Sequence, residues 1–252
     1  SFCEEDYAVS FYIAEFINSL TNLTYVYFAL RYMYTTTTTA SQKKTNSLLP
    51  KQYDFMSLSL LSVGTNSFVY HVTLRQTLQY ADDFSMLLLA WSLLHATLTV
   101  RQSSVTTQAI SVCLATIIPL FAAFYVQSGG KVIYHVLAFT AMLLLVGIRS
   151  LYLFHFASSP QFASSSKRKD WNRRMWKAAA VCVAGYALWQ VDLHFCAELR
   201  RLREDLGLPW AWGLELHGWW HVLTAIGASG FMDVAREVRD EDEEKVVVGE
   251  GG

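Results

Sequence analysis

The chain contains 252 residues, of which 53% are hydrophobic and 16% are charged, and its formal net charge is −1. Because soluble domains carry about 25% charged residues, this composition argues against an ordinary soluble protein. A nearly neutral chain also lacks the basic surface that a nucleic-acid partner requires. We therefore expect a membrane protein that binds no nucleic acid.

Apolar stretches of about 20 residues, the length that a membrane-spanning helix needs, recur along the sequence. We count seven predicted spans, centred approximately on 11–34, 54–74, 82–101, 108–127, 132–153, 175–196 and 212–235. The first is the least regular, because Glu15, Asn18 and Asn22 interrupt it. The predicted fold class is an all-α, polytopic seven-transmembrane-helix bundle over residues 1–235, followed by a disordered acidic tail over 236–252.

Lysine and arginine are unevenly distributed over the connections between the predicted spans, and their excess marks the cytosolic side. The first, third and fifth connections and the C-terminal tail hold the larger set, namely Lys43, Lys44, Lys51, Arg101, Lys167, Arg168, Lys169, Arg173, Arg174, Arg236, Arg239 and Lys245. We therefore expect a luminal N-terminus and a cytosolic C-terminus, in the endoplasmic reticulum or Golgi membrane. The sequence indicates no obligatory protein partner.

The stretch "ELHGWWHVLTAIG" places His217 and His221 four residues apart. On a helix, two residues at this spacing project from the same face, which is the geometry of a metal-ligand pair. The zinc-protease helix His-Glu-x-x-His carries its own general base, whereas here Gly218, Trp219 and Trp220 separate the histidines. A metal site at this position would need a base from elsewhere in the chain.

Ser67 and His71 also lie four residues apart, near the end of the second predicted span, and Asp82 opens the third. In the predicted topology they reach a depth similar to that of the histidine pair, on the luminal side. Ionisable groups within a membrane are costly and usually functional. Three histidines with one open position are typical of a catalytic zinc. The sequence therefore predicts an active site towards the luminal side.

Plainer interpretations exist for each of these residues. A single intramembrane histidine is more often a hydrogen-bonding partner between helices, and Ser67 can bond back to the carbonyl one turn earlier. We prefer His71 as the third ligand because Ser67 and Asp82 accompany it. His135 and His194 lie near the predicted luminal face and are the alternative ligands. His95 and His155 lie towards the cytosolic face, and we interpret them as structural.

Four segments spread over nearly the whole chain resemble the alkaline ceramidases, of a fungal type. They read "CEEDYAVSFYIAEFINSLTNL", "NSFVYHVTLRQTLQYADDFSM", "DLHFCAELR" and "ELHGWWHVLTAIGA". That family is similar to the adiponectin-receptor and progestin-receptor-like membrane hydrolases, which share seven helices and a zinc site. The resemblance implies that His71, His217 and His221 bind zinc, and that Ser67 and Asp82 are active-site residues.

This resemblance implies an alkaline ceramidase, an amide hydrolase that releases a sphingoid base and a fatty acid from ceramide, dihydroceramide or phytoceramide in the bilayer. Zinc would activate a water and polarise the amide carbonyl. Asp82 would transfer protons, and Ser67 would stabilise the developing oxyanion. The alternative is a heptahelical lipid receptor or carrier with a structural metal. A structural zinc normally has four protein ligands, so three histidines favour hydrolysis.

A second metal site is indicated at the N-terminus. The acidic stretch "CEEDY" and Glu15 gather carboxylates, which are ligands that calcium prefers, although an acidic end without an ion is the simpler interpretation. The resemblance implies calcium bound by Glu4, Asp6 and Glu15. Where the family usually has Asp-Trp before the cysteine, this chain has Ser1 and Phe2, whose backbone oxygens can still serve.

The predicted topology also indicates a disulfide bond. Cys3 precedes the first span and Cys196 ends the sixth, so both are luminal, whereas Cys113 and Cys182 lie within apolar segments. Disulfides form in oxidising compartments such as this lumen. The resemblance supports a Cys3–Cys196 bridge, because the ceramidases carry cysteines at both matching positions.

Overall fold

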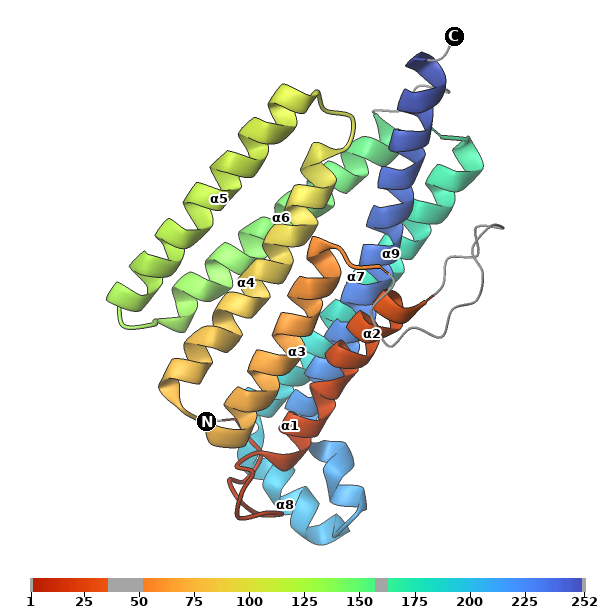
Figure 1. Ribbon diagram of the computed structural model, residues 1–252. Helices are drawn as coiled ribbons and strands as arrows, with labels where there is room; N and C mark the ends of the chain where they lie inside the picture. The colour runs from red at the N-terminus through yellow and green to blue at the C-terminus, as the bar shows by residue number, and fades with distance from the viewer. Residues whose placement is uncertain (1, 36–51, 157–162, 251–252) are drawn as a thin grey trace. The chain divides into compact units, whose positions relative to one another are not determined.

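The computed structural model describes residues 2–35, 52–156 and 163–250. In these ranges it contains helices and one isolated β-bridge, and no β-strand. The helices are α1 (Phe16–Thr21), α2 (Leu23–Tyr34), α3 (Phe55–Thr73), α4 (Gln76–Thr99), α5 (Ser104–Gln127), α6 (Val132–His155), α7 (Ser165–His194), α8 (Cys196–Leu206), the 3₁₀ helix η1 (Trp210–Leu214) and α9 (Leu216–Glu250) (Figure 1). The predicted all-α class is confirmed.

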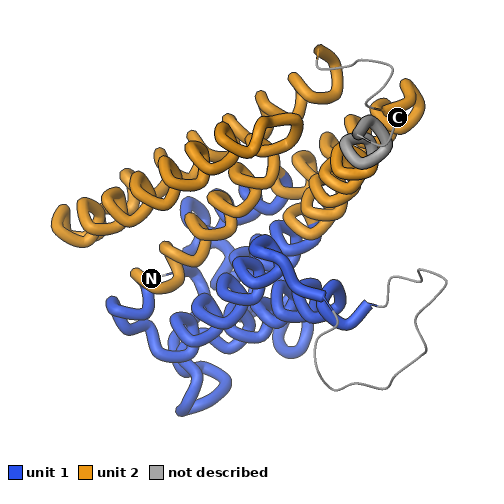
Figure 2. The backbone as a smooth tube through the Cα atoms, turned by 45° about the horizontal axis from the view of Figure 1, so that its top comes forward, with its two compact units in different colours: residues 1–79, 184–226 blue, residues 80–183, 227–252 orange. Residues whose placement is uncertain are grey.

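The chain forms two compact units (Figure 2). Unit 1 comprises residues 1–79 and 184–226, and unit 2 comprises 80–183 and 227–252. Unit 1 therefore contains α1, α2, α3, α8 and η1, together with the end of α7 and the start of α9. Unit 2 contains most of α4, all of α5 and α6, and the remaining parts of α7 and α9.

Within unit 1, α3 is defined at both ends by its sequence. Its start is a capping box, because Ser57 N donates to Asp54 Oδ1 at 2.7 Å and Asp54 N donates to Ser57 Oγ at 3.0 Å. It ends at Leu74, which adopts a left-handed conformation. Midway, Gly64 allows close packing against α2, since an added Cβ would lie 2.8 Å from Val26 Cγ2.

Within unit 2, two helices are long and apolar enough to cross a membrane, namely α5 and α6. A third candidate is the pair α7 and α8, which bends by 91° at the break between them. The side chains of Val112 and Leu120 on α5 are 67% and 65% exposed, as expected for a surface that faces lipid. These helices agree with three predicted spans. The total of seven spans and the orientation of the termini stay predictions.

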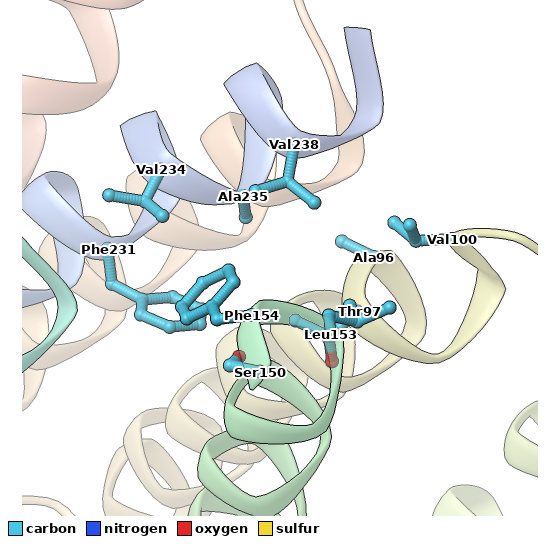
Figure 3. A pocket seen from close by; sticks show the side chains of 10 residues that line it. All are labelled: Ala96, Thr97, Val100, Ser150, Leu153, Phe154, Phe231, Val234, Ala235 and Val238. Carbon is cyan, nitrogen blue, oxygen red and sulfur yellow. The ribbon is translucent and has the colours of Figure 1, made fainter. Parts of the chain in front are cut away.

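The core of unit 2 is apolar. Its buried members lie at the C-terminal ends of α4 and α6, around the start of α7 and in the middle of α9, and are Val100, Leu153, Phe154, Ala163, Trp171, Met175, Val234 and Val238. A small pocket opens between α4, α6 and α9 against this core (Figure 3). Ser150 and Thr97 are its polar lining residues, and both hydroxyls donate to carbonyls of their own helix. The pocket therefore offers packing surface rather than chemistry.

The structure corrects two sequence expectations. Residues 11–34 do not form one continuous span, because helix begins only at Phe16 and α1 and α2 meet at Asn22. Residues 236–250 continue α9, where we expected a disordered tail. In this part of unit 2, Lys167 Nζ lies 2.6 Å from Glu241 Oε2, and Arg174 Nη1 lies 2.7 Å from Glu237 Oε1. These ion pairs join α9 to the basic start of α7, so the local composition of residues 236–250 could not predict them.

Candidate functional site

Three buried histidines come together in unit 1. His71 lies in the last turn of α3, and His217 and His221 lie in the first two turns of α9. One ligand nitrogen from each lies within 4.8 Å of the others. Their side chains are almost inaccessible, with residue exposures of 1%, 4% and 4%. Among the described residues, this is the one group of three or more metal-ligating side chains at such distances.

The last turn of α3 explains how His71 is placed. The final carbonyls of a helix have no partner within the helix. Here the carbonyl oxygens of His71 and Val72 accept from the amides of Glu15 and Ala14, both at 3.0 Å. This short pairing lays the segment before α1 against the end of α3. It brings the Glu15 carboxylate to the His71 ring, where Glu15 Oε2 lies 2.6 Å from His71 Nδ1.

The surroundings of the histidines fit a metal. Ligating histidines usually donate their second nitrogen to an oxygen acceptor. Glu15 occupies that position for His71, and Thr21 Oγ1 lies 3.0 Å from His221 Nδ1. His217 Nδ1 is buried and has no hydrogen-bond partner. Imidazole nitrogens suit zinc and other first-row metals, so the donor set agrees with the predicted zinc without identifying the ion.

Ser67 lies one turn before His71 on α3 and is buried. Neighbouring hydroxyls on this helix bond back to carbonyls, for example Ser59 Oγ to Phe55 O at 2.7 Å. The structure gives no such bond for Ser67. The active-site role of Ser67 stays a prediction.

Asp82 and its neighbour Asp83 belong to unit 2, whereas the histidines belong to unit 1. The convergence of Asp82 with the histidines therefore stays a prediction. Asp83 is engaged within its own unit, because Tyr125 donates its hydroxyl to Asp83 Oδ2 at 2.8 Å. His135 Nε2 lies 3.1 Å from the carbonyl of Asp83. These contacts give His135 a structural partner and engage the side chain of Asp83.

The other alternative ligand, His194, is exposed at the end of α7 and is not part of the cluster. Of the two histidines interpreted as structural, His95 Nε2 lies 2.9 Å from Ser111 Oγ in unit 2, and His155 is exposed at the end of α6. The preference for His71 as companion to the α9 pair therefore agrees with the geometry.

The predicted calcium residues have different environments. Glu4 is buried, and its two carboxylate oxygens accept from the amides of Ile17 and Asn18 at 2.6 and 2.8 Å, so that it caps α1. Burial raises the pKa of Glu4 to about 7, although these hydrogen bonds oppose the shift. Asp6 is exposed, and Glu15 is fully buried on His71 with its Oε1 unpaired.

These three carboxylates do not form a compact ligand group among the described residues. Phe2 is described, whereas Ser1 lies outside the described residues. The calcium assignment therefore stays a prediction.

The N-terminal segment contributes to the histidine cluster through the expected disulfide and through two contacts, made by Phe2 and by the Cys3 amide, that sequence analysis missed. The Phe2 ring stacks on His217, with centroids 3.8 Å apart and planes at 20°. The expected disulfide joins Cys3 to Cys196, with Cα atoms 5.2 Å apart, and Cys3 N donates to Asp192 Oδ2 at 3.1 Å. The Asp192 carboxylate also faces the backbone N–H of His217 at the positive end of α9.

One of these residues carried a signal in the sequence. Asp192 is an ionisable residue within a predicted span, and such residues are functional by default. Phe2 and Thr21 carried none, because their importance depends on contacts with α9, about two hundred residues away.

Comparison with known proteins gives concordant matches. The Ceramidase family profile matches residues 1–247. The chain is 27% identical over 242 residues to alkaline ceramidase YPC1 of Saccharomyces cerevisiae, covering 89% of this chain and 71% of that protein. It is 24% identical over 230 residues to alkaline ceramidase 3 of Mus musculus, covering 90% of this chain and 78% of that protein.

Proposed function

The chain belongs to the ceramidase family and is a ceramidase, and from this premise we propose that it is a zinc-dependent membrane amidase. The substrate would be a ceramide, including dihydroceramide or phytoceramide, and the products a sphingoid base and a fatty acid. The observation that carries the zinc assignment is the buried cluster of His71, His217 and His221.

Zinc held by these histidines would lower the pKa of a bound water to about 7 and polarise the amide carbonyl. The residues of the chain supply the rest. Water adds to the amide carbon, and Asp82 accepts the proton that this water loses. The carbon–nitrogen bond then breaks, and the same carboxyl group returns a proton to the departing amine. Ser67, a buried residue, donates a hydrogen bond to the oxygen on which negative charge develops.

The proposed setting is a seven-span membrane protein of the endoplasmic reticulum or Golgi, with the active site towards the lumen. The apolar helices α5 and α6 support membrane insertion, and a lipid substrate can enter from the bilayer. A calcium ion bound by Glu4, Asp6, Glu15 and the backbone of Ser1 and Phe2 is part of the proposal. Its support is the unpaired, buried Oε1 of Glu15.

The decisive experiment combines turnover with metal content. Purified protein is incubated with ceramide, dihydroceramide and phytoceramide, before and after removal of metal by a chelator, and zinc is measured in parallel by elemental analysis. We expect about one zinc per chain, with activity that disappears on chelation and returns with zinc. Turnover that survives complete metal removal would reject the zinc mechanism. Ceramide binding without any turnover would favour a lipid receptor or carrier.

A further inference from the structure

Thr21, the last residue of α1, contacts one of the three clustered histidines. Its Oγ1 lies 3.0 Å from His221 Nδ1. The same oxygen lies 2.9 Å from the carbonyl oxygen of Ile17 and 3.1 Å from that of Asn18. A hydroxyl has a single proton, and a Thr21 hydroxyl that donates it to one of these carbonyls meets His221 as a hydrogen-bond acceptor.

In that arrangement Nδ1 of His221 is the N–H, and Nε2 keeps the lone pair that a metal needs. The carboxylate of Glu15 lies 2.6 Å from Nδ1 of His71, so in His71 too it is Nδ1 that meets an oxygen atom. Thr21 thus has the same relation to His221 that Glu15 has to His71, with a neutral oxygen in place of a charged one.

Gly218 explains why α1 lies close enough for this contact. It sits in the helical turn between the two histidines of α9. A Cβ atom placed on Gly218 would lie 3.2 Å from Ile17 Cγ2 and from Thr21 Cγ2, and 3.4 Å from Thr21 Oγ1. The first two distances are shorter than ordinary van der Waals contacts, so a Cβ atom here would require Ile17 and Thr21 to shift by a few tenths of an ångström. The glycine within "HGWWH" therefore allows the backbones of α1 and α9 to approach each other.

The opposite end of α1 is fixed as well. Glu4 accepts from the amides of Ile17 and Asn18, and it is joined through Cys3 to Cys196. Ile17 is also one of the residues that meets Gly218. The short helix is therefore held at its first turn by a carboxylate and along its side by α9, which leaves the Thr21 hydroxyl in a defined position.

We propose that Thr21 is a positioning residue for His221, setting its tautomer and ring orientation, and that Gly218 provides the close approach this requires. The inference rests on the proposed zinc function. Thr21 acts through His221 and does not itself contact the substrate. Loss of such a partner typically lowers metal affinity by about 10–100-fold.

The test compares zinc affinity in three variants. Thr21→Val keeps the shape of the side chain and removes the hydroxyl, whereas Thr21→Ser retains it. Thr65→Val is the matched control, because Thr65 is exposed on α3 and bonds back to Leu61 O at 2.9 Å without touching a histidine. Affinity is measured by competition with a zinc chelator, and the melting temperature of the metal-free protein is measured alongside.

We expect Thr21→Val to bind zinc about 10–100-fold more weakly, and Thr21→Ser and Thr65→Val to remain within a few-fold of the wild type. The metal-free melting temperature of Thr21→Val should lie somewhat below that of Thr65→Val, since both lose a hydroxyl that bonds to its own helix but only Thr21→Val also removes the partner of His221 Nδ1. Gly218→Ala should weaken zinc binding in the same direction as Thr21→Val.

The outcomes separate this inference from the function on which it rests. A wild-type protein that binds no zinc would reject the proposed zinc function. A wild type that binds zinc, with Thr21→Val unchanged in affinity, would reject the positioning role alone. If Thr21→Val lowers the metal-free melting temperature while Thr21→Ser restores that stability but not zinc affinity, the hydroxyl is structural and the inference is also rejected.

Discussion

The two units of the molecule differ in what they bury. Among the described residues, unit 1 buries eight acidic, basic or imidazole side chains, whereas unit 2 buries two. The first set is Glu4, Glu15, His71, Asp192, Arg203, Glu215, His217 and His221, and the second is His135 and Arg236. Burying such groups is costly unless they are paired or functional. The contrast supports our proposal that unit 1 holds the metal site, and it leaves unit 2 with the two apolar helices that are long enough to cross a membrane.

The most severe way to test this contrast is to remove a histidine of the cluster. His217→Ala should lose nearly all bound zinc, and turnover should fall to the background rate, because two ligands cannot retain the ion. Elemental analysis and a ceramide hydrolysis assay measure the two effects. His194→Ala is the control, since His194 belongs to unit 1 but is exposed outside the cluster. Undiminished zinc in His217→Ala would remove the assignment.

A catalytic role for Asp82 would mean that unit 2 also contributes a residue to the chemistry. If this residue transfers protons, Asp82→Asn should retain zinc and lose about 10²–10⁴-fold in kcat. The companion variant Asp83→Asn should affect stability more than turnover, because Asp83 is bonded to Tyr125. Near-normal turnover in Asp82→Asn would transfer the role to Asp83 or to no residue.

Removal of the Cys3–Cys196 disulfide tests whether the stability of unit 1 depends on this covalent bond. Replacing both Cys3 and Cys196 by serine should lower the free energy of unfolding by about 2–5 kcal/mol, measured by denaturation in detergent micelles. Cys113→Ser changes an exposed free thiol of α5 in unit 2 and should have almost no effect. Equal stability of all three proteins would show that packing alone maintains the N-terminal segment.

The smallest expected effect is that of calcium. Calcium at about 100 times its dissociation constant should stabilise the protein by about 2.7 kcal/mol, seen as a higher melting temperature than in chelator. Asp6→Asn should reduce this gain, whereas Glu5→Gln, its exposed neighbour, should not. If neither calcium nor chelator changes the melting temperature, the proposal that Glu4, Asp6 and Glu15 bind calcium is rejected.

Sequence analysis anticipated different things in the two units. In unit 2, α5 and α6 were predictable because continuous hydropathy over about 20 residues is a local property. In unit 1, the histidine cluster was predictable because the spacing of His217 and His221 is also local. The break between α1 and α2 was missed, although Asn18 and Asn22, both buried there, were visible as interruptions of the predicted span.

The remaining errors and omissions share one physical cause. The helical continuation of α9 involves ion pairs between Lys167 and Glu241 and between Arg174 and Glu237. The roles of Thr21 and Phe2 depend on contacts with His221 and His217. Each joins residues that are far apart in the sequence, so no window of local composition contains both partners.

The Cys3–Cys196 bond closes most of the chain into a covalent ring and leaves α9 on a tail outside it. His71 therefore belongs to the ring, and His217 and His221 belong to the tail. One protease cut between α5 and α6 opens the ring, yet both pieces stay joined until a reductant is added. One cut between α8 and η1, by contrast, detaches the tail in the oxidised protein, and non-covalent contacts such as the Thr21–His221 hydrogen bond and the ion pairs between α7 and α9 then hold the fragments together.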